Sequence, residues 1–500
     1  MGWGIRRVPE TAPSTSGRGT PLARGVLVNA FGILVKVSRT GYLILFSRLI
    51  GADGFGIYLL AFTLQELAGK IGILGLHWGG GQAVGALLAK GEGGAIRGVM
   101  WRILAVAMLG SVAAAVGLYF LAPTLANLLG HPAVAAPLRV FAAAIPFMNG
   151  TYVLVYSFRP RLNMKYEMYI TSVIEPVTVL AAGAVLLTWR RRVEMAALAH
   201  VIAAAVAFGA AAVVFQWVYP RADARRGGRV DRALLVHGSF TMGVMDLFGN
   251  LKTRIDLLIL ARFLPVDMVG VYGAVTEIAG VLRKSRSAFD PIIMPIAQRL
   301  YLKQDHAGLQ RETTRAVGWA LQIGLGLLGL VLLVPERLLG LFGADFTGPV
   351  FTQVLMILAA GQFVNMSFGL GDGILAITGY GYVGLRSTLA MICADVVLLV
   401  LLIPHWGLLG AAFATSVTTV TVVLWRAARA RRLLGLRLFV RAHLPVPLSW
   451  VLGLAAGFGI LAGVGRGVFG DALALSGFGL IFFGLLHARG WLRGLVVPPG

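Results

Sequence analysis

Long apolar runs follow one another along almost the whole chain, and they restrict its fold more than any other feature. A membrane-spanning helix needs about 20 consecutive, mostly apolar residues. Fourteen runs approach or exceed that length: 26–47, 56–79, 99–121, 138–157, 169–188, 196–219, 233–261, 268–288, 316–334, 350–375, 384–403, 407–425, 445–463 and 473–488. Hydrophobic residues make up 58% of the chain and charged residues 13%, against roughly 45–50% and 25% in soluble proteins. The sequence predicts an all-α polytopic membrane protein with about 14 transmembrane helices.

A motif that joins the first two runs occurs again between the seventh and eighth. The four residues Arg48, Asp53, Gly56 and Tyr58 recur, each 214 positions later, as Arg262, Asp267, Gly270 and Tyr272. The same offset relates run 6 to run 12. A period of this length is too long for a solenoid and is typical of duplicated helix bundles in transporters. We interpret each copy as a hairpin at the membrane surface, with Arg48 held by Asp53 and Arg262 by Asp267.

The repeat divides the chain into five parts. We expect a disordered cytoplasmic tail (1–24), an N-terminal six-helix bundle (25–220), a cytoplasmic linker (221–232), a C-terminal six-helix bundle (233–435), and two additional transmembrane helices with a tail (436–500). Lys and Arg concentrate in the loops on the side of the N-terminus, which the positive-inside rule places in the cytoplasm. Only the triplet Arg190, Arg191 and Arg192 departs from this pattern, and it has no assigned role.

The net charge of +23 follows from these short basic loops. Such loops set the topology and contact anionic membrane lipids, so we do not expect nucleic acid as a partner. The sequence has no G-x-x-x-x-G-K-[ST] loop for ATP and no histidine pair with metal-ligand spacing. It also has no long loop for a catalytic domain. We therefore expect no cofactor, no metal and no enzymatic activity.

Charged residues inside the apolar runs are the candidate functional residues, because ionisable groups in a membrane are costly and usually face an interior cavity. The candidate substrate-binding cations are Lys36, Arg39, Lys70, Lys252 and Arg254. The candidates for ion coupling or charge pairing are Glu66, Asp246, Asp256, Glu277 and Asp395. Glu175, beside Pro176, either joins them or satisfies backbone groups freed by a kink.

Two interpretations of these charges stay open. A cavity lined by cations and fewer carboxylates suits a large anion such as pyrophosphate, which arginine binds in a bidentate manner. Alternatively the charges neutralise one another, Glu66 with Lys70 and Arg254 with Asp256 or Asp246. The repeat places Arg39 and Arg254 at almost equivalent positions of the two halves.

The motif Arg48…Asp53…Gly56-Ile-Tyr58, its second copy, and the run from Pro404 to Thr415 resemble the polysaccharide-transport branch of the multidrug/oligosaccharidyl-lipid/polysaccharide exporter (MOP) superfamily. The resemblance covers residues 25–435. It implies two bundles around a cavity that opens alternately to either side. It also implies a flippase for undecaprenyl-pyrophosphate-linked oligosaccharide in the bacterial inner membrane, with glycan-assembly proteins as further partners. Arg254 and Asp256 match the motif of the branch. Fourteen runs rather than twelve also resemble the related flippase of the peptidoglycan lipid precursor.

Two other functions are alternatives to this one. A multidrug/cation antiporter on the same fold would need an acidic cavity, which the cations in the first, second and seventh runs oppose. A membrane enzyme such as a glycan polymerase or ligase usually carries a large outer loop. The longest stretch between runs here is short and on the predicted cytoplasmic side.

Overall fold

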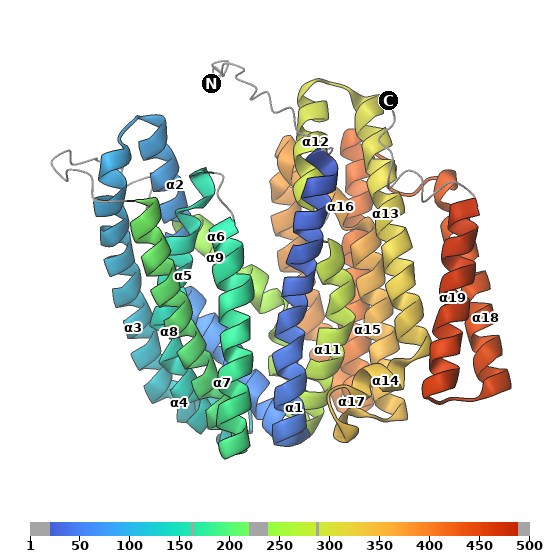
Figure 1. Ribbon diagram of the computed structural model, residues 1–500, viewed down its shortest axis with the longest axis horizontal. Coiled ribbons are helices and arrows are strands. Elements are labelled where there is room, and N and C mark those ends of the chain that lie inside the picture. Colours follow the sequence, from blue (N-terminus) through green and yellow to red (C-terminus); the bar gives the residue numbers. More distant parts are fainter. Residues whose placement is uncertain (1–20, 162–164, 220–238, 287–289, 489–500) are drawn as a thin grey trace.

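The computed structural model describes residues 21–161, 165–219, 239–286 and 290–488, and it describes side chains from residue 39 onward except at 291 and 292. The described residues form helices and short turns without a strand. Eight of these helices, or nine if one bent pair counts as a span, are long and apolar enough to cross a membrane. The molecule is therefore an all-α, multi-pass membrane protein (Figure 1).

The first half of the described chain contains eight α-helices. They are α1 (Pro21–Ile73), α2 (Leu76–Ala89), α3 (Ile96–Leu128), α4 (Ala135–Ala142), α5 (Ala144–Tyr156), α6 (Lys165–Tyr169), α7 (Glu175–Trp189) and α8 (Val193–Val218). A π-helical turn (Ile170–Ile174) joins α6 to α7. We call this part the N-terminal half.

The second half contains nine α-helices, followed by a separate pair. They are α9 (Ser239–Lys252), α10 (Ile255–Phe263), α11 (Val266–Arg286), α12 (Asp290–Leu302), α13 (His306–Leu333), α14 (Pro335–Gly340), α15 (Pro349–Phe368), α16 (Leu370–Leu375) and α17 (Gly381–Leu434), then α18 (Pro445–Val464) and α19 (Val468–Ala488). Helix bounds recur at the offset of the motif. Helix α4 begins at Ala135 and α15 begins 214 positions later at Pro349.

Glycines with positive φ divide the two longest helices into antiparallel arms. Gly51 has φ 70° in α1 and Gly407 has φ 55° in α17, and other residues rarely adopt this region. In Figure 1 the first arm of α1 descends from the end at which the helix begins, called the upper end here, and turns at the lower end. The first arm of α17 (381–406) also descends, and its second arm (408–434) returns.

Each of the fourteen predicted runs overlaps a helix or a broken helix of the structure. The number of membrane crossings and the other domain bounds stay predictions, and the linker 221–232 lies outside the described residues. The predicted tail is wrong at its end, because α1 begins at Pro21 and residues 21–24 are helical. Proline is favoured in the first turn of a helix, where its missing N–H costs nothing, so Pro21 marks a helix start.

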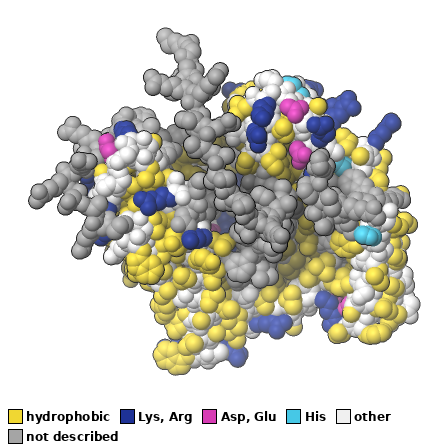
Figure 2. Space-filling view, turned by 45° about the horizontal axis from the view of Figure 1, so that its top comes forward, with side chains coloured by type: hydrophobic (Ala, Val, Ile, Leu, Met, Phe, Trp, Pro, Cys, Tyr) yellow, Lys and Arg dark blue, Asp and Glu magenta, His cyan; other side chains and the backbone are white. Residues whose placement is uncertain are grey.

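The outer surface has the distribution of side chains expected of a protein embedded in a membrane. Figure 2 shows broad hydrophobic flanks, with Lys and Arg side chains gathered around the upper end and a few at the lower end. Arg190, Arg191 and Arg192 fall in the turn between α7 and α8 and are exposed. The turn lies between two apolar helices, as predicted, and at the lower end (Figure 1).

The two copies of the repeated motif pack against each other at the lower end. A β-carbon on Gly56 would collide with the carbonyl oxygen of Val266, and one on Gly270 would collide with the carbonyl oxygen of Ala52. Ala52 and Val266 are themselves equivalent in the repeat, so the contact is reciprocal. Glycine at both positions lets the backbones of α1 and α11 touch, which is how small residues bring membrane helices together.

The C-terminal pair is attached along one side of the C-terminal half. Helices α18 and α19 pack on each other and on α13, and Figure 1 shows them at the edge of the molecule, away from α1. Gly453 and Gly457 of α18 contact Phe478 and Leu333, respectively. The spacing Gly453-x-x-x-Gly457 therefore marks a helix contact surface.

We predict that Gly56→Leu separates the two halves, because the new side chain has no space beside Val266. Overpacking of this kind typically costs about 1–3 kcal/mol. The melting temperature of the purified protein in detergent should fall clearly for Gly56→Leu and for Gly270→Leu. The control is Gly117→Leu, since a β-carbon there meets no atom within 4 Å. Equal melting temperatures for all three variants would contradict the contact.

Candidate functional site

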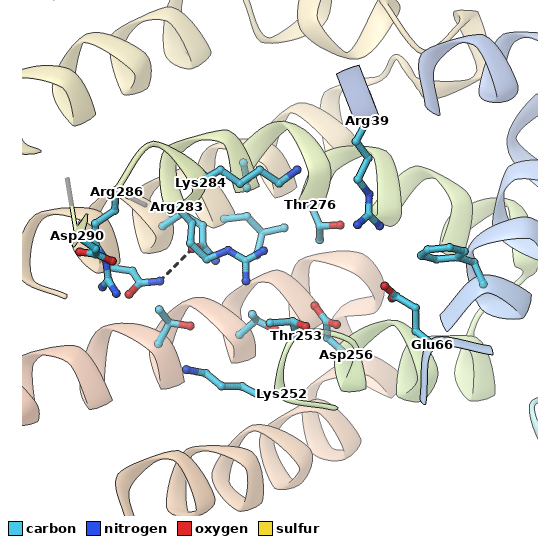
Figure 3. A pocket seen from close by; sticks show the side chains of 18 of the residues that line it. Arg39, Glu66, Lys252, Thr253, Asp256, Thr276, Arg283, Lys284, Arg286 and Asp290 are labelled. Atoms are coloured by element: carbon cyan, nitrogen blue, oxygen red, sulfur yellow. Dashed lines mark hydrogen bonds and ion pairs between the residues drawn. The ribbon is translucent and has the colours of Figure 1, made fainter. Parts of the chain in front are cut away.

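A cavity of about 670 Å³ lies between the two halves. The N-terminal half contributes side chains from α1, α5, α7 and α8, and the C-terminal half contributes them from α9, α10, α11, α15 and α17. Figure 3 shows Arg39 of α1, Lys252 of α9 and Arg283 of α11 extending into this common space. The shared chamber between the repeats, which the resemblance implies, is present.

The cavity is closed toward the lower end by aromatic side chains. Tyr58 Oη and His200 Nε2 share a buried hydrogen bond of 2.6 Å, and the His200 ring packs against Phe62 and Phe141. The lining residues of α11 lie between Thr276 and Arg286, in the half of that helix nearer the upper end. The chamber therefore extends from the middle of the molecule toward the upper end.

The lining does not contain the excess of cations that we expected. Its described members include six basic residues, namely Arg39, Lys252, Arg283, Lys284, Arg286 and Arg426. They also include six acidic residues, namely Glu66, Glu175, Asp256, Asp290, Asp372 and Asp395. Most of these carboxylates form ion pairs or hydrogen bonds with other residues of the protein. Which charges remain available to a ligand therefore depends on these pairs and not on the numbers of acidic and basic residues.

Two ion pairs join the halves. Arg254 of α10 lies 3.0 Å from the Glu66 carboxylate of α1, and Lys70 of α1 lies 2.7 Å from the Asp246 carboxylate of α9. The predicted pairing of Glu66 with Lys70 is therefore wrong, as is that of Arg254 with Asp256 or Asp246. The partners come from the facing helix, because the halves pack closely at Gly75 and Gly243.

Glu277 connects a second cation of α1, Arg39, to the C-terminal half. Its carboxylate is 2.6 Å from Lys284 and 4.0 Å from Arg39. Arg39 also lies over the Phe62 ring at 5.4 Å, and its Nε is buried without a hydrogen-bond partner. The Arg39 guanidinium is thus held near the cavity by weak contacts that leave donors available.

Two lining cations are unpaired within the described part of the chain. Neither Lys252 nor Arg283 has a hydrogen bond or ion pair to another described residue, and both face the cavity. A cation that stays hydrated in a chamber can exchange its water for an anion at little cost, whereas a buried paired charge cannot. Lys252 and Arg283 are therefore the groups best placed to bind an anionic ligand.

Four of the lining cations are not among the candidates predicted from the sequence. Arg283, Lys284 and Arg286 fall at the end of the predicted run 268–288, and Arg426 directly follows the run 407–425, so the sequence pattern groups all four with the basic loops. All four nevertheless lie in helices, because α11 extends to Arg286 and α17 extends to Leu434. Helical spacing was the available signal, since Thr276, Gly280 and Arg283 share one face of α11.

Of the predicted cations, Arg39 and Lys252 line the cavity, while Lys70 and Arg254 are engaged in pairs at its edge. The side chain of Lys36 lies outside the described side chains. Two of the predicted carboxylates of the C-terminal half accept hydrogen bonds from hydroxyl groups. Asp395 accepts from Thr418 at 3.0 Å, and Asp256 accepts from Tyr272 at 3.2 Å.

The described residues contain no group of three His, Cys, Asp or Glu side chains placed to hold a metal ion. Asp256 and Asp395, both at the cavity wall, remain the predicted candidates for coupling to an ion.

The charged residues of the repeated motif do not pair as predicted. Arg48 donates to the carbonyl oxygens of Leu341 and Gly340 at 2.7 and 3.3 Å, and the part of the chain that is described shows no ion pair between Arg48 and Asp53. The same holds for Arg262 and Asp267. Asp267 lies in the first turn of α11, and Asp53 lies in the first turn of the second arm of α1, after the break at Gly51. A carboxylate at either position is stabilised by the helix dipole without an arginine.

A multi-pass fold with a polar chamber between two repeated halves is typical of membrane transporters. The family model described as polysaccharide biosynthesis protein matches residues 22–288, more than half of the chain. The chain belongs to this family, which confirms the resemblance to the polysaccharide branch of the MOP superfamily.

Two curated relatives are similar over part of their length. The probable low-salt glycan biosynthesis flippase Agl15 of Haloferax volcanii is 22% identical over 189 residues, 37% of this chain and 39% of the relative. The capsular polysaccharide biosynthesis protein CapF of Staphylococcus aureus is 25% identical over 172 residues, 34% of this chain and 43% of the relative. The chain thus spans about two fifths of each of these relatives.

A solved structure shares the fold along almost the whole chain. The lipid II flippase MurJ in an inward closed conformation superposes with a TM-score of 0.71, covering 94% of this chain and 99% of its own, at 12% identity. At that identity the similarity concerns the architecture alone.

We predict that Glu66→Gln and Arg254→Gln each lower the melting temperature, because each leaves a partly buried partner charge unpaired. The two residues are in contact, so their effects should not add. A double-mutant cycle should give a coupling energy of roughly 0.5–3 kcal/mol, measured by thermal unfolding in detergent. Arg102→Gln, on the outer face of α3, is the control. Strictly additive effects would show that the pair contributes nothing.

Proposed function

We propose that the protein is a flippase that moves an undecaprenyl-pyrophosphate-linked oligosaccharide across the bacterial inner membrane for cell-surface polysaccharide biosynthesis. Membership of the polysaccharide biosynthesis family and the named flippase among its relatives support this class of function. The observation that carries the proposal is the pair of unpaired cations, Lys252 and Arg283, in a chamber between two repeated halves.

The ligand class follows from the chemistry of these cations. A pyrophosphate carries several negative oxygens, and charge-assisted hydrogen bonds from Lys and Arg to phosphate are stronger than neutral ones. Arg39 and Lys252 extend from different halves and Arg283 lies near both (Figure 3), so one headgroup would contact both halves at once. The lipid chain would stay in the bilayer while the sugar enters the cavity.

Translocation would follow from rocking of the halves. With the N-terminus in the cytoplasm, the upper end faces the cytoplasm and the packed lower end closes the cavity to the outside. The reciprocal contact of Gly56 with Gly270 would have to open for release. An ion gradient would drive translocation in one direction, with Asp256 and Asp395 as the carboxylates that bind the coupling ion.

A second candidate function rests on Glu175. Among the described lining residues it is the one carboxylate without a hydrogen bond or ion pair, and an unpaired acid in a cavity suits a cationic ligand. A multidrug/cation antiporter would use it in that way. We favour the flippase, because the unpaired lining cations outnumber this acid and the family is one of polysaccharide biosynthesis.

We predict that Lys252→Gln and Arg283→Gln each reduce glycan export at least tenfold at unchanged abundance in the membrane. Loss of a charge-assisted hydrogen bond typically costs about 1.5–3 kcal/mol, and roughly 1.4 kcal/mol corresponds to tenfold. The measurement is surface polysaccharide in a strain that depends on the protein. A second readout is transfer of an undecaprenyl-pyrophosphate-linked sugar across proteoliposomes.

Two controls separate the candidates. Arg102→Gln removes an exposed arginine outside the cavity and should export normally. Glu175→Gln should abolish resistance to cationic drugs if the protein is an antiporter, and it should leave drug susceptibility unchanged if the protein is a flippase. Full glycan export by the double variant Lys252→Gln/Arg283→Gln would overturn the proposed role of the cavity.

A further inference from the structure

A second hollow lies between the two arms of α17, outside the central cavity. This hollow, called the α17 groove here, has a volume of about 560 Å³, within the range of small-ligand sites. One side is formed by residues four positions apart on the first arm, Tyr382, Arg386 and Ala390. The other side is formed by Trp425, Arg429 and Leu433 of the second arm.

The groove carries two arginines without an acidic partner. Arg386 and Arg429 are exposed, and within the described chain neither forms an ion pair or a hydrogen bond. Each guanidinium lies over an aromatic ring of its own arm, Arg386 at 5.7 Å from Tyr382 and Arg429 at 5.0 Å from Trp425. Stacking fixes the planar group and leaves its N–H donors free to bind an oxyanion.

The position of the groove is that of a membrane interface. Its residues belong to the first turns of α17 and to the last turns before Leu434, so they lie at the upper end. Tyr and Trp are enriched at the level of lipid headgroups. The neighbouring side chains Leu385, Leu389 and Leu424 are exposed large hydrophobic groups, as expected for a surface in contact with acyl chains.

A buried arginine separates the groove from the central cavity. Arg426 Nε donates to Ser387 Oγ at 2.6 Å, and Ser387 lines the groove. Arg426 Nη1 is 2.8 Å from the Asp372 carboxylate, and Asp372 lines the cavity. Since Arg426 is held on both sides, it acts as a partition, and Val422 lines both hollows.

We propose that the α17 groove is a binding site for an anionic phospholipid, with the phosphate held by Arg386 and Arg429. The two free guanidinium groups match the charge of a lipid phosphate, and the apolar side chains beside them match its acyl chains. Arg426 lies between the groove and the central cavity, so a lipid phosphate bound by Arg386 and Arg429 would lie outside that cavity. The inference does not depend on the proposed function.

The site can be tested by titrating the purified protein in detergent with phosphatidylglycerol and, separately, phosphatidylcholine, counting bound lipids by native mass spectrometry. The wild-type protein should bind phosphatidylglycerol at least tenfold more tightly than phosphatidylcholine. Arg386→Gln/Arg429→Gln should remove that preference. Arg386→Lys/Arg429→Lys, which keeps the charge, should retain most of it. An unchanged melting temperature would show that the variants are folded.

A matched control is Arg431→Gln/Arg432→Gln, which removes the same charge from the same end of α17 outside the groove. It should bind phosphatidylglycerol as the wild type does. An equal loss in this control would mean diffuse attraction to a basic surface and would overturn the proposal. So would equal affinity for the two phospholipids. Binding of undecaprenyl pyrophosphate in the groove without binding of phosphatidylglycerol would instead assign it to the substrate.

Discussion

The close approach of α1 and α11 at two equivalent glycines is the constraint on which the rest of the structure depends. Gly56 faces Val266, and Gly270 faces Ala52, the residue equivalent to Val266 in the repeat. The backbones of the two helices therefore touch at both glycines. This contact fixes the start of the second arm of α1 against the start of α11, and so sets how far apart their later turns lie. The chamber is the space that opens between the halves beyond this contact.

Electrostatics then decides which side chains that space can hold. Charges within a low-dielectric layer are tolerated when they are paired or hydrated. Pairs such as Arg254 with Glu66 join the halves, and their charges are neutralised within the protein. Lys252 and Arg283 instead face the open space of the chamber. The charged residues that hold the halves together are therefore not the ones that are available to a ligand.

The sequence predicted the helical class, the order of the helices and the repeat, because hydropathy and the recurring motif report directly on them. It also pointed to Arg39 and Lys252 at the cavity. It did not predict the ion pairs, because Glu66 and Lys70 are close in the sequence but each forms its ion pair with a residue of the other half. It missed Arg283 and Arg426, since helices extend beyond their apolar part and cations near helix ends resemble loop residues.

The attachment of α18 and α19 along α13 has a consequence for how such a chain can change over time. No residue of this pair lines the central chamber among those described, and its main packing partners are each other and α13. Natural selection can therefore alter, exchange or lengthen this appendage as a separate unit, while the duplicated core retains the geometry inherited from its ancestral half.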